Sequence, residues 1–130
     1  MKTIANVAMA VICSMLMCGT VFASNGVEPV ATTEVTYDYL VDQTETVKAK
    51  TTDVYDVTLR RGETFYIYVS GDGDTDLDLY IYDENGNLID SDLEIRDSCL
   101  CSVTPKWTGK FKVKIKNLGN VYNRYHFYII

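Results

Sequence analysis

Hydrophobic and polar residues alternate along most of this chain after its first 34 positions. In a β-strand successive side chains point to opposite faces, so a period of two indicates one buried face and one exposed face. The clearest case is Lys110–Lys116, in which lysine fills every second position. We predict that Phe111, Val113 and Ile115 enter a core and that the lysines between them face water. Such lysines would also protect an edge strand from pairing with other chains.

Nine segments have strand character, and no window after the N-terminal segment has the 3.6-residue period of an amphipathic helix. The ten tyrosines favour a pleated surface. Asn85-Gly86 is a strong hairpin signal, because both residues tolerate the positive φ of a tight turn. This spacing of short strands and turns predicts an all-β antiparallel sandwich of eight or nine strands. The predicted strands are Thr36–Val41, Glu45–Lys50, Asp53–Leu59, Thr64–Ser70, Asp76–Tyr82, Leu88–Asp92, Ser98–Val103, Lys110–Lys116 and Tyr122–Ile130.

The N-terminal segment has the pattern of a secretory signal peptide. Lys2 supplies a positive charge, and the apolar stretch Ile4–Met17 is short for a membrane span. Val21-Phe22-Ala23 places small residues where a signal peptidase needs them, so we predict cleavage after Ala23. A lipoprotein would instead use Cys18, but the bulky residue before it disfavours that cleavage. We therefore predict a signal peptide (1–23), a flexible lead-in (24–34), one β-sandwich domain (35–130), a secreted or periplasmic location and no membrane insertion after cleavage.

The charge of the chain excludes one class of partner. The formal net charge is −6, whereas proteins that bind nucleic acids present a basic surface to the phosphates, so we expect no nucleic-acid partner. Acidic residues concentrate in Gly71–Asp97, and Lys106–Ile130 contains lysine and arginine but no acid. We expect neighbouring strands to present complementary outer faces. The alternative is that an exposed row of lysines contacts an anionic surface.

Few residues offer reactive chemistry. His126 is the only histidine and lies within a predicted strand, so a Ser/His or Cys/His catalytic arrangement is disfavoured. We predict that the protein is not an enzyme. Cys99 and Cys101 are the cysteines that remain after cleavage. Two residues apart on a strand, they lie at the limit of disulfide geometry, so a bridge between them would need a bulge or a turn.

An acidic run is the candidate metal site. Residues 71–87 read GDGDTDLDLYIYDENGN, with Asp72, Asp74, Asp76 and Asp78 at every second position. An EF-hand is excluded, because Leu77 stands where that loop needs glycine and the flanks have strand character. Clustered carboxylates with loop carbonyls suit calcium in a non-helical site. The alternative is a solvated acidic turn in which Asp76 or Asp78 caps backbone N–H groups.

Trp107 is a candidate ligand contact. It lies in a predicted turn, and exposed rings at loop tips can stack on sugars. Tryptophan and tyrosine more often pack in the core or at its rim. A polysaccharide ligand is therefore one of the alternatives that the sequence leaves open.

Three stretches together resemble the bacterial pre-peptidase C-terminal domain: the acidic run, Thr104–Gly109, and the lysine-rich strand Lys110–Lys116. Val57–Phe65, where a strand turns at glycine into another strand, also fits. The resemblance implies a jelly-roll-like sandwich without catalytic activity, and relatives in collagenases bind substrate and calcium. It assigns the calcium role to Asp76 and Asp78. We expect a non-catalytic binding module for an extracellular protein or polysaccharide; the alternative is a structural or interaction protein of the cell envelope.

Overall fold

The computed structural model describes residues 39–130, which form eight β-strands. The predicted signal peptide and lead-in lie outside this part of the chain. In residues 39–130 no helix is long and apolar enough to cross a membrane. The strands are β1 (Val41–Val47), β2 (Thr52–Leu59), β3 (Phe65–Ser70), β4 (Leu77–Tyr82), β5 (Leu88–Asp92), β6 (Ser98–Val103), β7 (Gly109–Asn117) and β8 (Asn123–Ile129).

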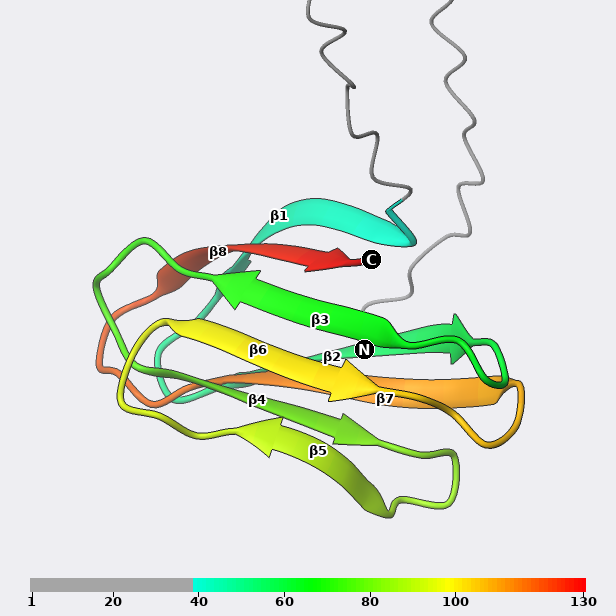
Figure 1. The fold of residues 1–130 in the computed structure, drawn as a ribbon. Coiled ribbons are helices and arrows are strands. Elements are labelled where there is room, and N and C mark those ends of the chain that lie inside the picture. The colour runs from blue at the N-terminus through cyan, green and yellow to red at the C-terminus, as the bar shows by residue number, and fades with distance from the viewer. Residues whose placement is uncertain (1–38) are drawn as a thin grey trace, which may run out of the picture. The chain divides into compact units, whose positions relative to one another are not determined.

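The strands form two antiparallel sheets that pack face to face. The first sheet has the order β1-β8-β3-β6 and the second β2-β7-β4-β5. Consecutive strands fall in different sheets except for β4 and β5, which form a hairpin (Figure 1). Two four-stranded antiparallel sheets with these crossing connections make a jelly-roll sandwich. The fold class predicted from the sequence is confirmed.

The core consists of the side chains that alternate inward from both sheets. On β7 the predicted inward residues Phe111, Val113 and Ile115 are at most 1% exposed. On β4 the side chains at 77, 79 and 81 are fully buried. The core residues are Val41, Val47, Tyr55, Val57, Leu59, Phe65, Ile67, Val69, Leu77, Leu79, Ile81, Cys99, Cys101, Val103, Phe111, Val113, Ile115, Tyr125, Phe127 and Ile129.

The predicted strands before β2 differ from the observed one. Residues 36–38 of the predicted strand Thr36–Val41 lie outside the described part of the chain, and between residue 39 and β2 there is one strand, Val41–Val47, which pairs along its whole length with β8. It ends at Val47 and is followed by a turn in which Lys50 has a φ of 57°, outside the extended region of a regular strand. The lysine-rich strand β7 is central rather than at an edge, because it pairs with β2 on one side and β4 on the other. Two of its lysines, Lys112 and Lys114, contact side chains on these neighbouring strands.

Cys99 and Cys101 are free thiols that point into the core from β6. The Cys99 thiol donates a hydrogen bond to the carbonyl of Leu77, at 3.0 Å. Burial raises the pKa of both thiols to about 12, so the reactive thiolate forms are suppressed in the folded domain.

Candidate binding surfaces

The four aspartates of the acidic run make contacts with different parts of the fold. Asp72 and Asp74 are exposed in the β3–β4 loop, Asp76 is half-buried before β4, and Asp78 is buried on β4. Carboxylate oxygens of Asp72 and Asp76 accept hydrogen bonds of 2.9 Å from the backbone amides at positions 124 and 96. Asp78 accepts one from the Tyr80 hydroxyl, also 2.9 Å long. The capping role considered for Asp76 is thus present in the structure.

The structure supports a metal site at the acidic run less well than the sequence does. Within residues 39–130, no three His, Cys, Asp or Glu side chains are grouped so that they could hold one. Two other oxygens nevertheless converge beside Gly71. A Cβ atom there would lie 2.6 Å from Oδ1 of Asn123 and 2.8 Å from Oδ2 of Asp97. Asn123 is fully buried, and its Oδ1 has no hydrogen-bond partner in the described part of the chain. Calcium binding stays a prediction.

Sequence reasoning missed Asp97 and Asn123. Both come to Gly71 through the crossing connections of the sandwich, from segments far away along the chain. The Gly71 amide donates to the Asp97 carbonyl at 2.9 Å, which fixes the two loops side by side. No local motif marks either residue, so only the strand register reveals this pair of oxygens.

Trp107 covers part of the core instead of standing free at a loop tip. Its ring stacks on Phe111 with 6.0 Å between centroids and an interplanar angle of 25°. The ring also lies over Gly109, where a Cβ atom would come within 2.9 Å of it. A ligand could therefore reach only part of the indole surface, and the ligand role of Trp107 stays a prediction.

The outer side of the first sheet carries an aromatic surface that the sequence analysis did not single out. We call Tyr39, Tyr66, Tyr68 and Tyr128 the tyrosine face. Tyr68 on β3 and Tyr128 on β8 are directly paired in the sheet, and their rings stack at 4.8 Å with an angle of 9°. Tyr39 meets Tyr128 edge-on at 5.9 Å. Tyr66 is 44% exposed. The predicted alternation of strands contained this signal, because tyrosines at 66, 68 and 128 fall on outward positions.

The tyrosine face keeps polar groups for a ligand. Within residues 39–130, no hydrogen bond engages the hydroxyls of Tyr66, Tyr68 or Tyr128. Partial burial, with Tyr68 and Tyr39 nearby, raises the pKa of Tyr128 further above the physiological range, in which a tyrosine hydroxyl is already a neutral donor. Beside it, His126 and Asp42 form an ion pair or hydrogen bond across β8 and β1. The surface is thus aromatic with a polar margin.

The outer side of the second sheet is charged, and its groups contact one another. Lys112 bonds to Asp56 on β2 with a distance of 2.7 Å. The Lys114 ammonium lies 4.5 Å from the centre of the Tyr82 ring. These contacts fit the expectation that neighbouring strands present complementary outer faces.

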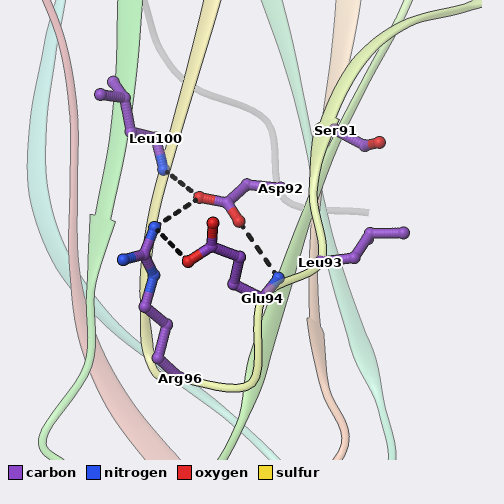
Figure 2. Close-up of a pocket in the computed structure, with 6 residues that line it drawn as sticks. All are labelled: Ser91, Asp92, Leu93, Glu94, Arg96 and Leu100. Atoms are coloured by element: carbon purple, nitrogen blue, oxygen red, sulfur yellow. Dashed lines mark hydrogen bonds and ion pairs between the residues drawn. The ribbon is translucent and has the colours of Figure 1, made fainter.

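A hollow of about 550 Å³ opens where β5 leads into β6 (Figure 2). Asp92 lies at its centre and accepts hydrogen bonds from the amides of Leu100, at 3.0 Å, and Glu94, at 3.2 Å. Arg96 lies 3.4 Å from Asp92 and 3.1 Å from Glu94. The hollow is lined by Ser91, Asp92, Leu93, Glu94, Arg96 and Leu100.

The two carboxylates of β5 also close one edge of the sandwich. Asp90 accepts a 3.0 Å hydrogen bond from the Ser102 amide, just as Asp92 does from Leu100. Strands β5 and β6 are the edges of different sheets, so these side chains bond amides that the sheet itself leaves unpaired. We call Asp90 and Asp92 the carboxylate clasp. It blocks the β6 edge against pairing with another strand.

Comparison with solved structures places the fold among known sandwiches. The chain is similar to the pre-peptidase C-terminal domain of a collagenase from Bacillus anthracis, with a TM-score of 0.52 and 14% identity over 69% of this chain and 90% of that one. It is also similar to PliG from Aeromonas hydrophila, a periplasmic inhibitor of g-type lysozyme, with a TM-score of 0.49 and 8% identity over 68% and 82% of the two chains. No protein-family model and no curated protein sequence matches the chain. The likeness to the collagenase domain supports the predicted pre-peptidase C-terminal type of fold.

Proposed function

We propose that this protein is an exported, non-catalytic binding module whose tyrosine face binds another protein. The observation that carries the proposal is the row of tyrosines on the outer side of β3 and β8. Tyrosine is enriched at the energetic centres of protein interfaces, because its rigid ring adds large contact area and its hydroxyl a hydrogen bond.

The geometry of the rings favours a protein ligand over a polysaccharide. Tyr68 and Tyr128 stack on each other with nearly parallel planes, so each ring covers one face of the other. Tyr39 also meets Tyr128 edge-on, so these rings leave less open face for a sugar to stack on than isolated rings would. The edges and hydroxyls of these rings remain available, and they suit the mixed apolar and polar contacts of a protein interface. A polysaccharide ligand is therefore the alternative outcome of the test.

The structure offers a matched control for this surface. Tyr80 and Tyr82 also stack, at 6.3 Å and 21°, but on the outer side of the other sheet. The first donates its hydroxyl to Asp78 and the second lies under Lys114, so both are already engaged within the domain. Replacing this pair removes the same chemistry from the opposite surface of the molecule.

The experiment uses three immobilised baits: the natural chain, Tyr68→Ser/Tyr128→Ser and Tyr80→Ser/Tyr82→Ser. Each bait is exposed to the exported proteins of the producing cell, and bound material is identified by mass spectrometry and by sugar analysis. We expect a protein that the natural chain and the Tyr80/Tyr82 variant retain and the Tyr68/Tyr128 variant loses. Equal capture by all three baits, or capture of a polysaccharide, would overturn the proposal. Melting curves of the variants confirm that all three are folded.

We also propose that calcium stabilises the β3–β4 loop. The support is the pair of oxygens beside Gly71: Oδ2 of Asp97, which also accepts a hydrogen bond from the Gly73 amide, and the unpartnered Oδ1 of Asn123. An ion that binds only the folded state stabilises it by about 2.7 kcal/mol at a hundredfold excess over its Kd. We expect a higher melting temperature in millimolar calcium than in chelator, and a smaller rise for Asp97→Asn. Asp56→Asn, on β2 of the second sheet, is the control and should show the same rise as the natural chain. Identical melting curves in calcium and in chelator would exclude calcium binding.

A further inference from the structure

The loop between β5 and β6 exposes an unusual amount of apolar surface. Ile95 is 93% exposed, the most of any large hydrophobic side chain in residues 39–130. Leu93 and Leu100, which line the adjacent hollow, are 53% and 46% exposed (Figure 2). A soluble domain tolerates single exposed apolar residues, but a group around a hollow is typical of a contact surface.

The loop is held in place on both sides of Ile95. Before it, the Glu94 amide is bonded to Asp92 at 3.2 Å. After it, the Arg96 amide donates to the Asp76 carboxylate at 2.9 Å, and the Arg96 carbonyl accepts from the Leu77 amide at 3.0 Å. Ile95 is therefore presented to solvent by a loop that the rest of the fold fixes, which reduces the entropy lost on binding.

The charges next to Ile95 indicate what covers it. Glu94 and Arg96 flank it and pair with each other within the chain at 3.1 Å, with side chains that are still 69% and 50% exposed. Two copies of this segment that meet antiparallel about a two-fold axis place Glu94 of each copy against Arg96 of the other, so the pair within each chain is exchanged for a pair across the axis. Both pairs are then attractive, and Ile95 lies near the axis. A two-fold interface requires this kind of self-complementary patch.

We propose that a second copy of this chain docks on the β5–β6 loop to form a two-fold dimer. Ile95 of each copy packs against Leu93 and Leu100 of the other, and Glu94 faces Arg96 across the axis. With three apolar side chains from each copy, the contact belongs to the small, transient class of interfaces, so we expect a dimer that dissociates readily. It adjoins the tyrosine face, because Leu100 on β6 is paired directly with Tyr68 on β3.

The test is sedimentation velocity of the natural chain, purified as the producing cell makes it, from about one to several hundred micromolar. We expect a dimer that dissociates on dilution and that Ile95→Glu abolishes. Leu88→Glu is the control, because that apolar side chain is also exposed, at 53%, but lies at the start of β5, away from the loop. It should leave the dimer unchanged. A natural chain that stays monomeric at the highest concentration overturns the proposal.

Charge reversal tests the arrangement about the axis. Glu94→Arg and Arg96→Glu should each weaken self-association about tenfold or more, because each places like charges opposite one another twice. An equimolar mixture of these two variants should form a heterodimer, since both cross-axis pairs then become attractive again. A mixture that stays monomeric contradicts the two-fold arrangement. Melting temperatures close to that of the natural chain show that the variants are folded, because surface ion pairs contribute little to stability.

Discussion

Replacing Asp92 of the carboxylate clasp by alanine should destabilise the domain by about 2–4 kcal/mol. Its carboxylate accepts hydrogen bonds from the amides of Leu100 and Glu94, and the side chain is only 10% exposed. A hydrogen bond to a charged group contributes roughly 1.5–3 kcal/mol. The ion pair with the half-exposed Arg96 adds at most about 1 kcal/mol, because solvent screens it. For a domain of this size, the loss lowers the melting temperature by roughly ten degrees or more.

Denaturant unfolding with an unchanged m-value measures the loss, and amide exchange at Leu100 locates it. Glu94→Ala is the matched control, because Glu94 contacts the same arginine at 3.1 Å but is 69% exposed. We expect it to cost less than about 0.5 kcal/mol, as for most surface substitutions. If Glu94→Ala costs as much as Asp92→Ala, or if exchange at Leu100 does not change, the stability comes from the arginine and the clasp reasoning is wrong.

Three further outcomes are expected. Burial opposes the charged form of Asp92, but hydrogen bonds from the Leu100 and Glu94 amides and the Arg96 charge outweigh burial and lower the pKa of Asp92. The stability that Asp92 contributes is therefore complete above about pH 4 and is lost as the pH falls through the lowered pKa. Asp92→Asn should make the stability depend less steeply on pH in acid unfolding curves. Val113→Asp should cost several kcal/mol in denaturant midpoint and Lys110→Asp far less, since only the former buries a carboxylate; equal losses would refute the assigned faces of β7. Thiol reagents should modify Cys99 no faster than the domain unfolds, and rapid labelling of the folded protein would contradict its burial.

The strands could be predicted because they alternate strictly. Phe111, Val113 and Ile115 lie between lysines, so a single register satisfies burial and solvation together. The order of the strands is not contained in that pattern. Lysines favour an edge in isolation, yet β7 is central, and there Lys112 pairs with Asp56 on β2 while the Lys114 ammonium lies over the Tyr82 ring on β4.

The segment before β2 shows why one boundary was wrong. Val41 and Val47 are buried at the two ends of β1, while the residues between them are polar and alternate only weakly. The sequence therefore looks like two strands separated by a loop. Pairing with β8 along seven residues holds the segment extended, and this long-range interaction has no local signal.

The candidate sites depend even more on tertiary structure. The acidic run is visible in the sequence, but Asp72 and Asp76 cap amides of the distant residues Arg124 and Arg96. The stacking of Tyr68 on Tyr128 needs two strands that are 60 positions apart in the chain to become neighbours. Composition could show that tyrosines are abundant, but not that four of them share one surface.

Calorimetric titration of the captured protein ligand into the matched tyrosine variants tests the central claim most directly. Removal of two interface tyrosines at an energetic centre typically weakens binding by about a hundredfold or more. We expect a loss of that size for Tyr68→Ser/Tyr128→Ser, and a Kd within about threefold of the natural chain for Tyr80→Ser/Tyr82→Ser. If the two variants bind equally well, or if the Tyr80/Tyr82 variant is the weaker one, the tyrosine face is not the binding surface.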